Sequence, residues 1–192
     1  RGNADAFQGG YHHILAGVNS TLDSVIGPLN VAADYMDRIS KGDIPPVITD
    51  EYHGDFDQIK NNINTCINAI NSLVEDMDIL SVATVKGDLL IRSDAGKHSG
   101  DFAKIVEGVN LTLDTLVGFI DEMPAPVMII NNDYDIQYMN KIGSSILGKT
   151  QNELTGQKCY DNFKTSHCRT ENCSCARAMK LDDKVTAETD AH

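Results

Sequence analysis

Apolar residues recur every three or four positions along most of residues 1–123, in the rhythm of a heptad repeat. This rhythm predicts amphipathic helices, because residues three and four apart lie on one face of an α-helix. Three stripes follow it: Tyr11, Leu15, Val18, Leu22, Val25, Leu29, Ala32, Met36 and Ile39; Phe56, Ile59, Ile63, Cys66, Ile70, Leu73, Met77 and Leu80; and Phe102, Val106, Val109, Leu113, Leu116, Ile120 and Met123. Each stripe covers two of seven positions, so a helix needs partner helices to bury it. The partners belong either to a second copy of the chain or to an antiparallel bundle within a monomer.

The helices repeat at a fixed period. The phrase "GDFDQIKNNIN" at 54–64 returns as "GDFAKIVEGVN" at 100–110 and, more weakly, as "GGYHHILAGVN" at 9–19. Tyr11 and Phe56 are 45 residues apart, and Phe56 and Phe102 are 46 apart. "KGDI" and "KGDL" place Gly42 and Gly87 at the same interval of 45. A repeat of this length indicates a stacked array.

The repeated phrase is read as a helix start. Asp55 is predicted to be an N-cap with Gln58 as its capping-box partner, Asp101 repeats the cap, and Gly10 takes the cap position in the first copy. An asparagine follows eight residues after each aromatic residue, at Asn19, Asn64 and Asn110. These asparagines are expected either to set the register between helices or to lie on an exposed polar face.

The segment between the first two stripes contains Pro45 and Pro46 and is predicted to be non-helical. It takes 14 steps from Gly42 to Phe56. An extended chain of that length reaches about 45 Å, which is enough to run back along a helix of about 16 residues. The next helix then begins beside the start of the previous one and runs parallel to it.

A different pattern begins after Met123, because Pro124 and Pro126 disfavour further helix. Residues 127–130 and 136–139 are predicted to form a hairpin around turn residues 131–133. Short helices are expected in "KIGSSILG", "TQNEL", "CYDNF" and "CARAMKL", with Thr150 and Glu153 at capping-box spacing.

Residues 1–123 resemble a tandem array of HAMP linkers. The resemblance implies parallel, homodimeric four-helix bundles with residues 1–24 as the second helix of an incomplete unit, 25–72 as one unit and 73–123 as another. In the first full unit, Pro28 matches the proline of the first helix, and Gly42, Ile44 and Ile48 match the connector glycine and its packing residues. Gly87 and Leu89 match in the second, but Ser93 stands where an apolar residue is expected, so this connector is expected to dock less tightly. The implied packing and signalling residues are Pro28, Gly42, Ile44, Ile48, Asp55, Phe56, Ile63, Gly87, Leu89, Asp101 and Phe102.

Residues 124–192 resemble a PAS sensor domain, with "ELTGQKCYDNF" in the middle of the match. A complete PAS domain has three further strands, so this one is expected to be partial. The predicted fold is therefore mainly α, with tandem parallel four-helix bundles followed by a small C-terminal α+β PAS-like domain.

The concentrated chemistry lies in "CYDNFKTSHCRTENCSC", which holds His167 and four cysteines, Cys159, Cys168, Cys173 and Cys175. Such thiols are candidate ligands of a metal ion or an iron–sulfur cluster, or form a redox-sensitive disulfide. The spacing lacks paired C-x2-C knuckles, so buried or incidental thiols are the alternative. Cys66 lies on an apolar stripe and is expected in the core.

Composition narrows the function. The formal net charge of −12 has the wrong sign for binding nucleic acid, and no apolar run is long enough to cross a membrane. Five cysteines, an odd number, argue against a secreted disulfide framework and favour a reducing cytoplasm. The sequence contains no phosphate-binding loop and no nucleophile motif. The histidines at the helix starts, His12, His13, His53 and His98, are expected to be solvated. No enzymatic activity is therefore predicted.

The HAMP and PAS resemblances imply a signal-relay segment of a bacterial methyl-accepting chemotaxis receptor. Its homodimer would lie on the cytoplasmic side of an inner-membrane protein, and a kinase-control module would follow in the same chain. The alternatives are the same modules from a sensor histidine kinase, or a cysteine-based redox or metal sensor in which the HAMP array is a spacer. The first residue is Arg and the last stretch, "DDKVTAETDAH", has no closing element, so a longer protein is expected.

Overall fold

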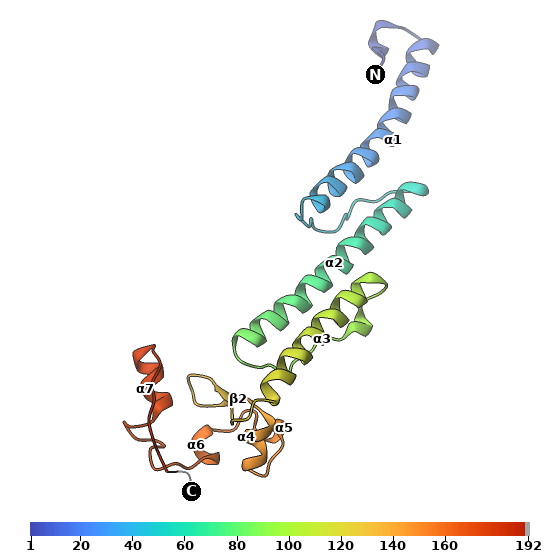
Figure 1. Ribbon diagram of the computed structural model, residues 1–192. Coiled ribbons are helices and arrows are strands. Elements are labelled where there is room, and N and C mark those ends of the chain that lie inside the picture. Colours follow the sequence, from blue (N-terminus) through green and yellow to red (C-terminus); the bar gives the residue numbers. More distant parts are fainter. Residues whose placement is uncertain (191–192) are drawn as a thin grey trace. The chain divides into compact units, whose positions relative to one another are not determined.

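The computed structural model describes residues 1–190 (Figure 1). The chain divides into two compact units, one from Arg1 to Val74 and one from Glu75 onward. It is mainly helical, with a small two-stranded sheet near the C-terminus, as predicted from the sequence. None of the helices that the structure describes is both long and apolar enough to cross a membrane.

The first unit contains a 3-10 turn, η1 (Ala4–Ala6), the long helix α1 (Gly10–Ser40) and the first part of α2 (Asp55–Val85). Residues 41–54, here called the first connector, are non-helical as predicted. Pro28 lies inside α1 without interrupting it. The helix of the first stripe and the helix expected from Val25 onward are therefore one continuous element.

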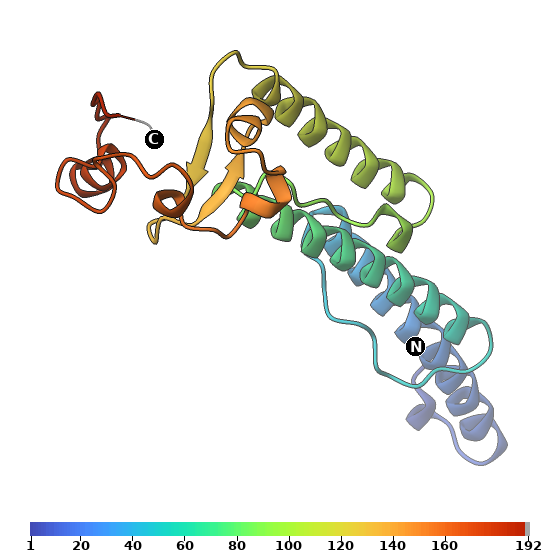
Figure 2. The same ribbon diagram turned by 90° about the horizontal axis from the view of Figure 1, so that it is seen from below.

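The first connector returns along α1, so that α1 and α2 point the same way (Figures 1 and 2). Ile48 of the connector packs with Ile63 and Ile67 of α2. Partly buried residues of α1 and of the connector complete this cluster: Val31, Ala32, Tyr35, Ile39, Ile44 and Tyr52. The predicted parallel helix–connector–helix arrangement is confirmed within this unit.

The connector glycines end their helices. Gly42 has φ +79° and Gly87 has φ +87°, a left-handed conformation that L side chains adopt poorly. The Gly42 N–H donates to Ile39 O, and the Asp43 N–H donates to Arg38 O. Gly87 and Asp88 make the same two bonds at the end of α2, to Thr84 O and Ala83 O. These pairs form the Schellman motif, which explains why a glycine stands at each position.

The predicted N-caps are wrong by one residue. Asp55 and Asp101 are the first residues of α2 and α3 (Asp101–Asp121), and Gly10 is the first residue of α1. The preceding residue is in each case a glycine with φ near +60°: Gly9, Gly54 and Gly100. The positive φ of the residue before each helix favours glycine at that position. The aspartates therefore lie one residue later, in the first turn, where a negative charge complements the helix dipole.

The second unit begins with the last part of α2 and continues through residues 86–100, here called the second connector, into α3. The second connector contains the turn η2 (Ala95–Lys97). As in the first unit, the helices before and after the connector run in the same direction (Figure 2). The end of α3 at Asp121 agrees with the boundary predicted before Pro124.

The predicted hairpin and short helices follow. β1 (Met128–Ile130) pairs antiparallel with β2 (Ile136–Met139). The four helices are α4 (Lys141–Ile146), α5 (Gln151–Leu154), α6 (Cys159–Asn162) and α7 (Ser174–Leu181). Thr150 and Glu153 form the predicted capping box of α5. The core here consists of Ile136, Met139, Leu154 and Cys159.

Candidate functional site

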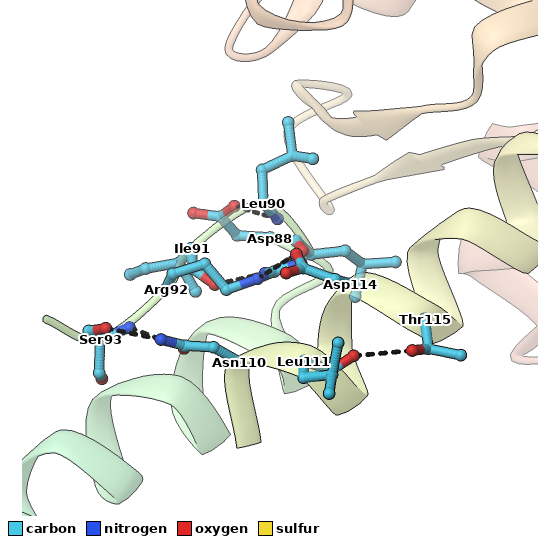
Figure 3. Close-up of polar contacts among 10 residues, drawn as sticks. Asp88, Leu90, Ile91, Arg92, Ser93, Asn110, Leu111, Asp114 and Thr115 are labelled. Carbon is cyan, nitrogen blue, oxygen red and sulfur yellow. Dashed lines mark hydrogen bonds and ion pairs between the residues drawn. The ribbon is translucent and has the colours of Figure 1, made fainter. Parts of the chain in front are cut away.

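An asparagine side chain holds the backbone of each connector against the helix that follows. The Ile48 N–H donates to Asn64 Oδ1 at 2.7 Å, and Asn64 Nδ2 donates to Ile48 O at 2.9 Å. Asn110 makes the same pair of bonds with Ser93, at 3.2 and 2.8 Å (Figure 3). Asn19 makes it with Gly2, at 3.0 and 2.7 Å. We call this two-bond contact the asparagine clamp.

The asparagine clamp corrects both sequence interpretations of these asparagines, because the amide neither sets register between helices nor merely faces solvent. An extended connector residue has a free N–H and C=O, and a primary amide satisfies both at once. The signal was present in the sequence as an asparagine 16 or 17 residues after each clamped position. The sequence alone does not reveal the clamp, because the asparagine bonds to backbone atoms. The clamped residue can therefore be of any type, here Ile48, Ser93 or Gly2.

Apolar side chains close the first connector. Ile48 and Ile63 are buried as predicted, and Ile44 is half-buried. Pro28 and Phe56 line a very small cavity beside Ile48 and Tyr52, which places both predicted residues at the docked connector. Ile67, which lies outside the predicted stripe, is fully buried because it faces the connector. Cys66, expected in the core, is half-buried in the single chain.

Polar side chains close the second connector. His98 Nε2 lies 2.6 Å from Asp76 Oδ2, and the two side chains are 2% and 11% exposed. The Ser93 hydroxyl donates to Asp76 O at 3.4 Å. Arg92 of the connector pairs with Asp114 of α3 at 2.8 Å (Figure 3). The expectation that His98 is solvated is therefore wrong, because an acidic partner on the preceding helix holds its imidazole inside.

The two closures occupy matching positions of the repeat. Val31 and Asp76 are 45 residues apart, as are Ile48 and Ser93, and Tyr52 and His98 are 46 apart. The apolar set contributes to the core of the first unit, whereas the polar set forms a hydrogen-bonded group in the second. We call Val31, Ile48 and Tyr52 the apolar seal, and Asp76, Ser93 and His98 the polar seal.

The other predicted residues lie at the ends of these elements. Phe102 and Leu89 are half-buried, and the Leu89 carbonyl accepts a bond from Arg92 at 2.8 Å. Asp55 and Asp101 are exposed, and Asp101 pairs with Lys104 at 2.7 Å. Gly87 packs so closely on Ile129 that an added Cβ would collide with it.

Much of the predicted stripe on α1 stays exposed in the single chain. The exposed members are Tyr11, Val18, Leu22, Val25, Leu29 and Met36. Leu116 and Met123 of the third stripe are also exposed. Large apolar side chains gathered at heptad spacing are typical of a surface that another helix covers.

Buried polar groups join the end of α3 to the hairpin and to the helices after it. Asp121 Oδ1 accepts bonds from Tyr138 Oη and Gln151 Nε2, both at 2.8 Å, and from the Lys141 N–H at 3.1 Å. Burial, with the Asp121 carboxylate second, raises the pKa of the Tyr138 phenol. Asn140, fully buried, donates to Ile120 O at 3.1 Å and accepts from the Val127 N–H at 2.9 Å. The carboxyl end of α3 is thereby fixed to β2, α4 and α5.

The four clustered cysteines come together. Cys159, Cys168, Cys173 and Cys175 line one cavity of about 180 Å³, together with His167. All are free thiols, and Cys159 also belongs to the adjacent core. Burial raises the pKa of the Cys159 thiol to about 11, and the neighbouring thiols add to the rise. Within residues 1–190, no three His, Cys, Asp or Glu side chains are grouped as ligands of a single metal ion.

Two family models match the chain. The model described as HAMP domain matches residues 6–72, and the model described as PAS fold matches residues 120–192. No curated protein and no solved structure matches. HAMP and PAS domains together indicate a signal-transduction module. The sequence-based resemblance is thus confirmed for one HAMP domain and for the PAS fold, while the tandem array and the predicted domain boundaries stay predictions.

Proposed function

We propose that this chain is the relay segment of a methyl-accepting chemotaxis receptor, in which HAMP units convert an input into helix repacking and are coupled to a PAS sensor. The proposal includes a second HAMP-type unit in residues 73–123. The supporting observation is that the second connector repeats the left-handed glycine, the asparagine clamp and the parallel helices of the first.

The relay acts in a parallel homodimer. The exposed apolar stripe of α1 meets the same stripe of a second chain, which completes a four-helix bundle with α2 and its copy. Two packings of such a bundle differ by rotation or tilt of the helices, and an input biases one of them. Each connector is bound to the following helix by its clamp and packs against the preceding helix through its seal. It therefore favours the bundle packing in which the seal residues keep their contacts.

The junction at Asp121 gives the PAS fold a mechanical connection to this bundle. A change at β2 or α5 alters the bonds of Tyr138 or Gln151 to Asp121 and so reaches the end of α3. The segment itself has no catalytic role in this proposal. The output module lies in the same chain, on the cytoplasmic side of an inner membrane.

The dimer is tested by Leu29→Asp. Leu29 is 48% exposed in the single chain, so a charge there leaves the fold of the monomer intact but disrupts the dimer seam. We expect multi-angle light scattering to give the mass of one chain for this variant and of two chains for the parent. Asp34→Lys, at an exposed position outside the stripe, is the matched control and keeps the dimer mass. An unchanged mass for Leu29→Asp, or a monomeric parent, contradicts the relay mechanism.

Ile44→Asp and Ile63→Asp test the connector in the full-length protein, where an altered signalling output is expected. The receptor class is tested by the sequence that follows this segment in its gene. A long heptad hairpin without catalytic motifs supports a chemotaxis receptor. A histidine phosphoacceptor helix followed by an ATP-binding domain indicates a sensor histidine kinase instead.

A further inference from the structure

The cavity between α6 and α7 has an unusual set of donors. Its polar lining consists of four thiols, the imidazole of His167, and the hydroxyls of Thr165, Ser174 and Thr189. Among residues 1–190, the remaining lining residues, Met128 and Phe163, are apolar, and no carboxylate lines the cavity. Hard cations such as Mg²⁺ and Ca²⁺ take oxygen ligands, usually including carboxylates, whereas thiolates select soft metals.

One of these donors is buried without a partner. His167 Nδ1 is inaccessible to solvent and makes no hydrogen bond to any group in residues 1–190. A buried polar atom in that state costs about 1–3 kcal/mol, so one of the residues that line the cavity has a hydrogen-bonding nitrogen without a partner. Cys168, by contrast, already contacts Thr165 Oγ1 at 3.3 Å.

The size of the cavity distinguishes one metal ion from a larger centre. A tetrahedral zinc ion lies about 2.3 Å from each sulfur, so four ligands poised for it would converge on one point. Within residues 1–190 no three of these donors form such a group, and they line a cavity of about 180 Å³. A cavity of about 150 Å³ holds a benzene molecule. The space therefore suits a centre of several atoms that residues of the lining could hold together.

We propose that this cavity binds an iron–sulfur cluster, with Cys159, Cys168, Cys173 and Cys175 as its ligands and His167 beside it. Each ligating thiol gives up its proton to solvent as it bonds to iron, and the cluster sulfide accepts a hydrogen bond from His167 Nδ1. Cys159 supplies a ligand from the core, and the other three come from the loop after α6 and the start of α7. This site does not depend on the relay mechanism, because it lies within the PAS fold alone.

The test uses the whole chain, purified without oxygen and incubated with ferric iron, sulfide and a thiol reductant, which reduces part of the iron to the ferrous state. We expect iron and acid-labile sulfide to be bound in equal amounts, together with visible charge-transfer absorption. Cys168→Ser and Cys173→Ser are expected to lose at least half of the bound iron. Both thiols lie outside the buried core, so circular dichroism should match the parent. Cys66→Ser, on α2, is the matched control and keeps the full amount.

His167→Phe separates the role of the imidazole from that of the thiols. This variant is expected to retain the iron but to shift the reduction potential of the cluster, because hydrogen bonds to cluster sulfur tune that potential. Two results overturn the proposal. One is iron binding no greater than that of the variant with all four cysteines replaced by serine. The other is a single zinc or copper ion per chain, bound in preference to iron and sulfide.

Discussion

The two connectors share the backbone contacts at their ends and differ in the side chains that they bury. Both have a left-handed glycine as their second residue, both are held by an asparagine clamp, and both lead into a helix that starts after another glycine with positive φ. Their seals differ at all three positions. The clamp fixes the position of the connector backbone along the following helix. The seal determines whether apolar packing or polar bonds hold the connector against the preceding helix.

The seals differ in how their stability arises. The apolar seal removes apolar surface from water, and this gain depends little on geometry. The polar seal takes a carboxylate and an imidazole out of water, a cost that only a well-formed pair offsets. The contact of 2.6 Å between His98 and Asp76 meets that condition. Small displacements should therefore weaken the second connector more than the first, which gives a physical reason for the looser docking expected from Ser93.

The largest expected effect is on the apolar side of the comparison. Ile67→Ala removes a fully buried side chain from beneath the first connector. We expect the free energy of unfolding of the first unit to fall by about 3 kcal/mol, in the range for buried Ile→Ala changes. Urea denaturation measures it. Val74→Ala, on the same helix at 51% exposure, is the control and should change by less than about 0.5 kcal/mol. A loss below about 1 kcal/mol for Ile67→Ala would refute this packing.

The next effect concerns the polar seal. Asp76→Ala leaves His98 buried without its acceptor, and we expect the second unit to lose about 2 kcal/mol. Amide hydrogen exchange across residues 86–100 measures the loss as faster exchange. The double variant Asp76→Val, His98→Tyr transfers two residues of the apolar seal and should recover most of the protection. Asp78→Ala, at an exposed neighbour on α2, serves as the control. If the double variant exchanges as fast as Asp76→Ala, the two seals are not interchangeable.

The sequence predicted what local chemistry specifies. Three predicted features depend only on residues close together in the sequence, and the structure contains all three. They are the non-helical segment at the Pro-Pro pair of the first connector, the Thr150–Glu153 capping box and the hairpin around residues 131–133. The heptad spacing predicted the helices but not which residue faces the connector, because Ile67 lies outside the stripe. The pairing of Asp76 with His98 spans 22 residues and has no local signature. The thiols were grouped in sequence, but the cavity they surround became visible only in three dimensions.

The smallest expected effect tests the feature that the two connectors share. Asn64→Ala and Asn110→Ala each remove both bonds of a clamp, at a cost of about 1 kcal/mol per clamp. The amide hydrogens of Ile48 and Ser93 should then exchange faster, since each donates to the asparagine that is lost. The increase should be larger at Ser93, because Ile48 is still held by its buried side chain, whereas Ser93 is only half-buried. Asn61→Ala is the control: within residues 1–190 the Asn61 side chain bonds only to Asp57 on its own helix, so its loss should leave both amides unchanged. Equal increases in exchange rate at Ile48 and Ser93 would mean that the two seals stabilise their connectors equally. The two connectors would then differ in the chemistry of their seals but not in stability.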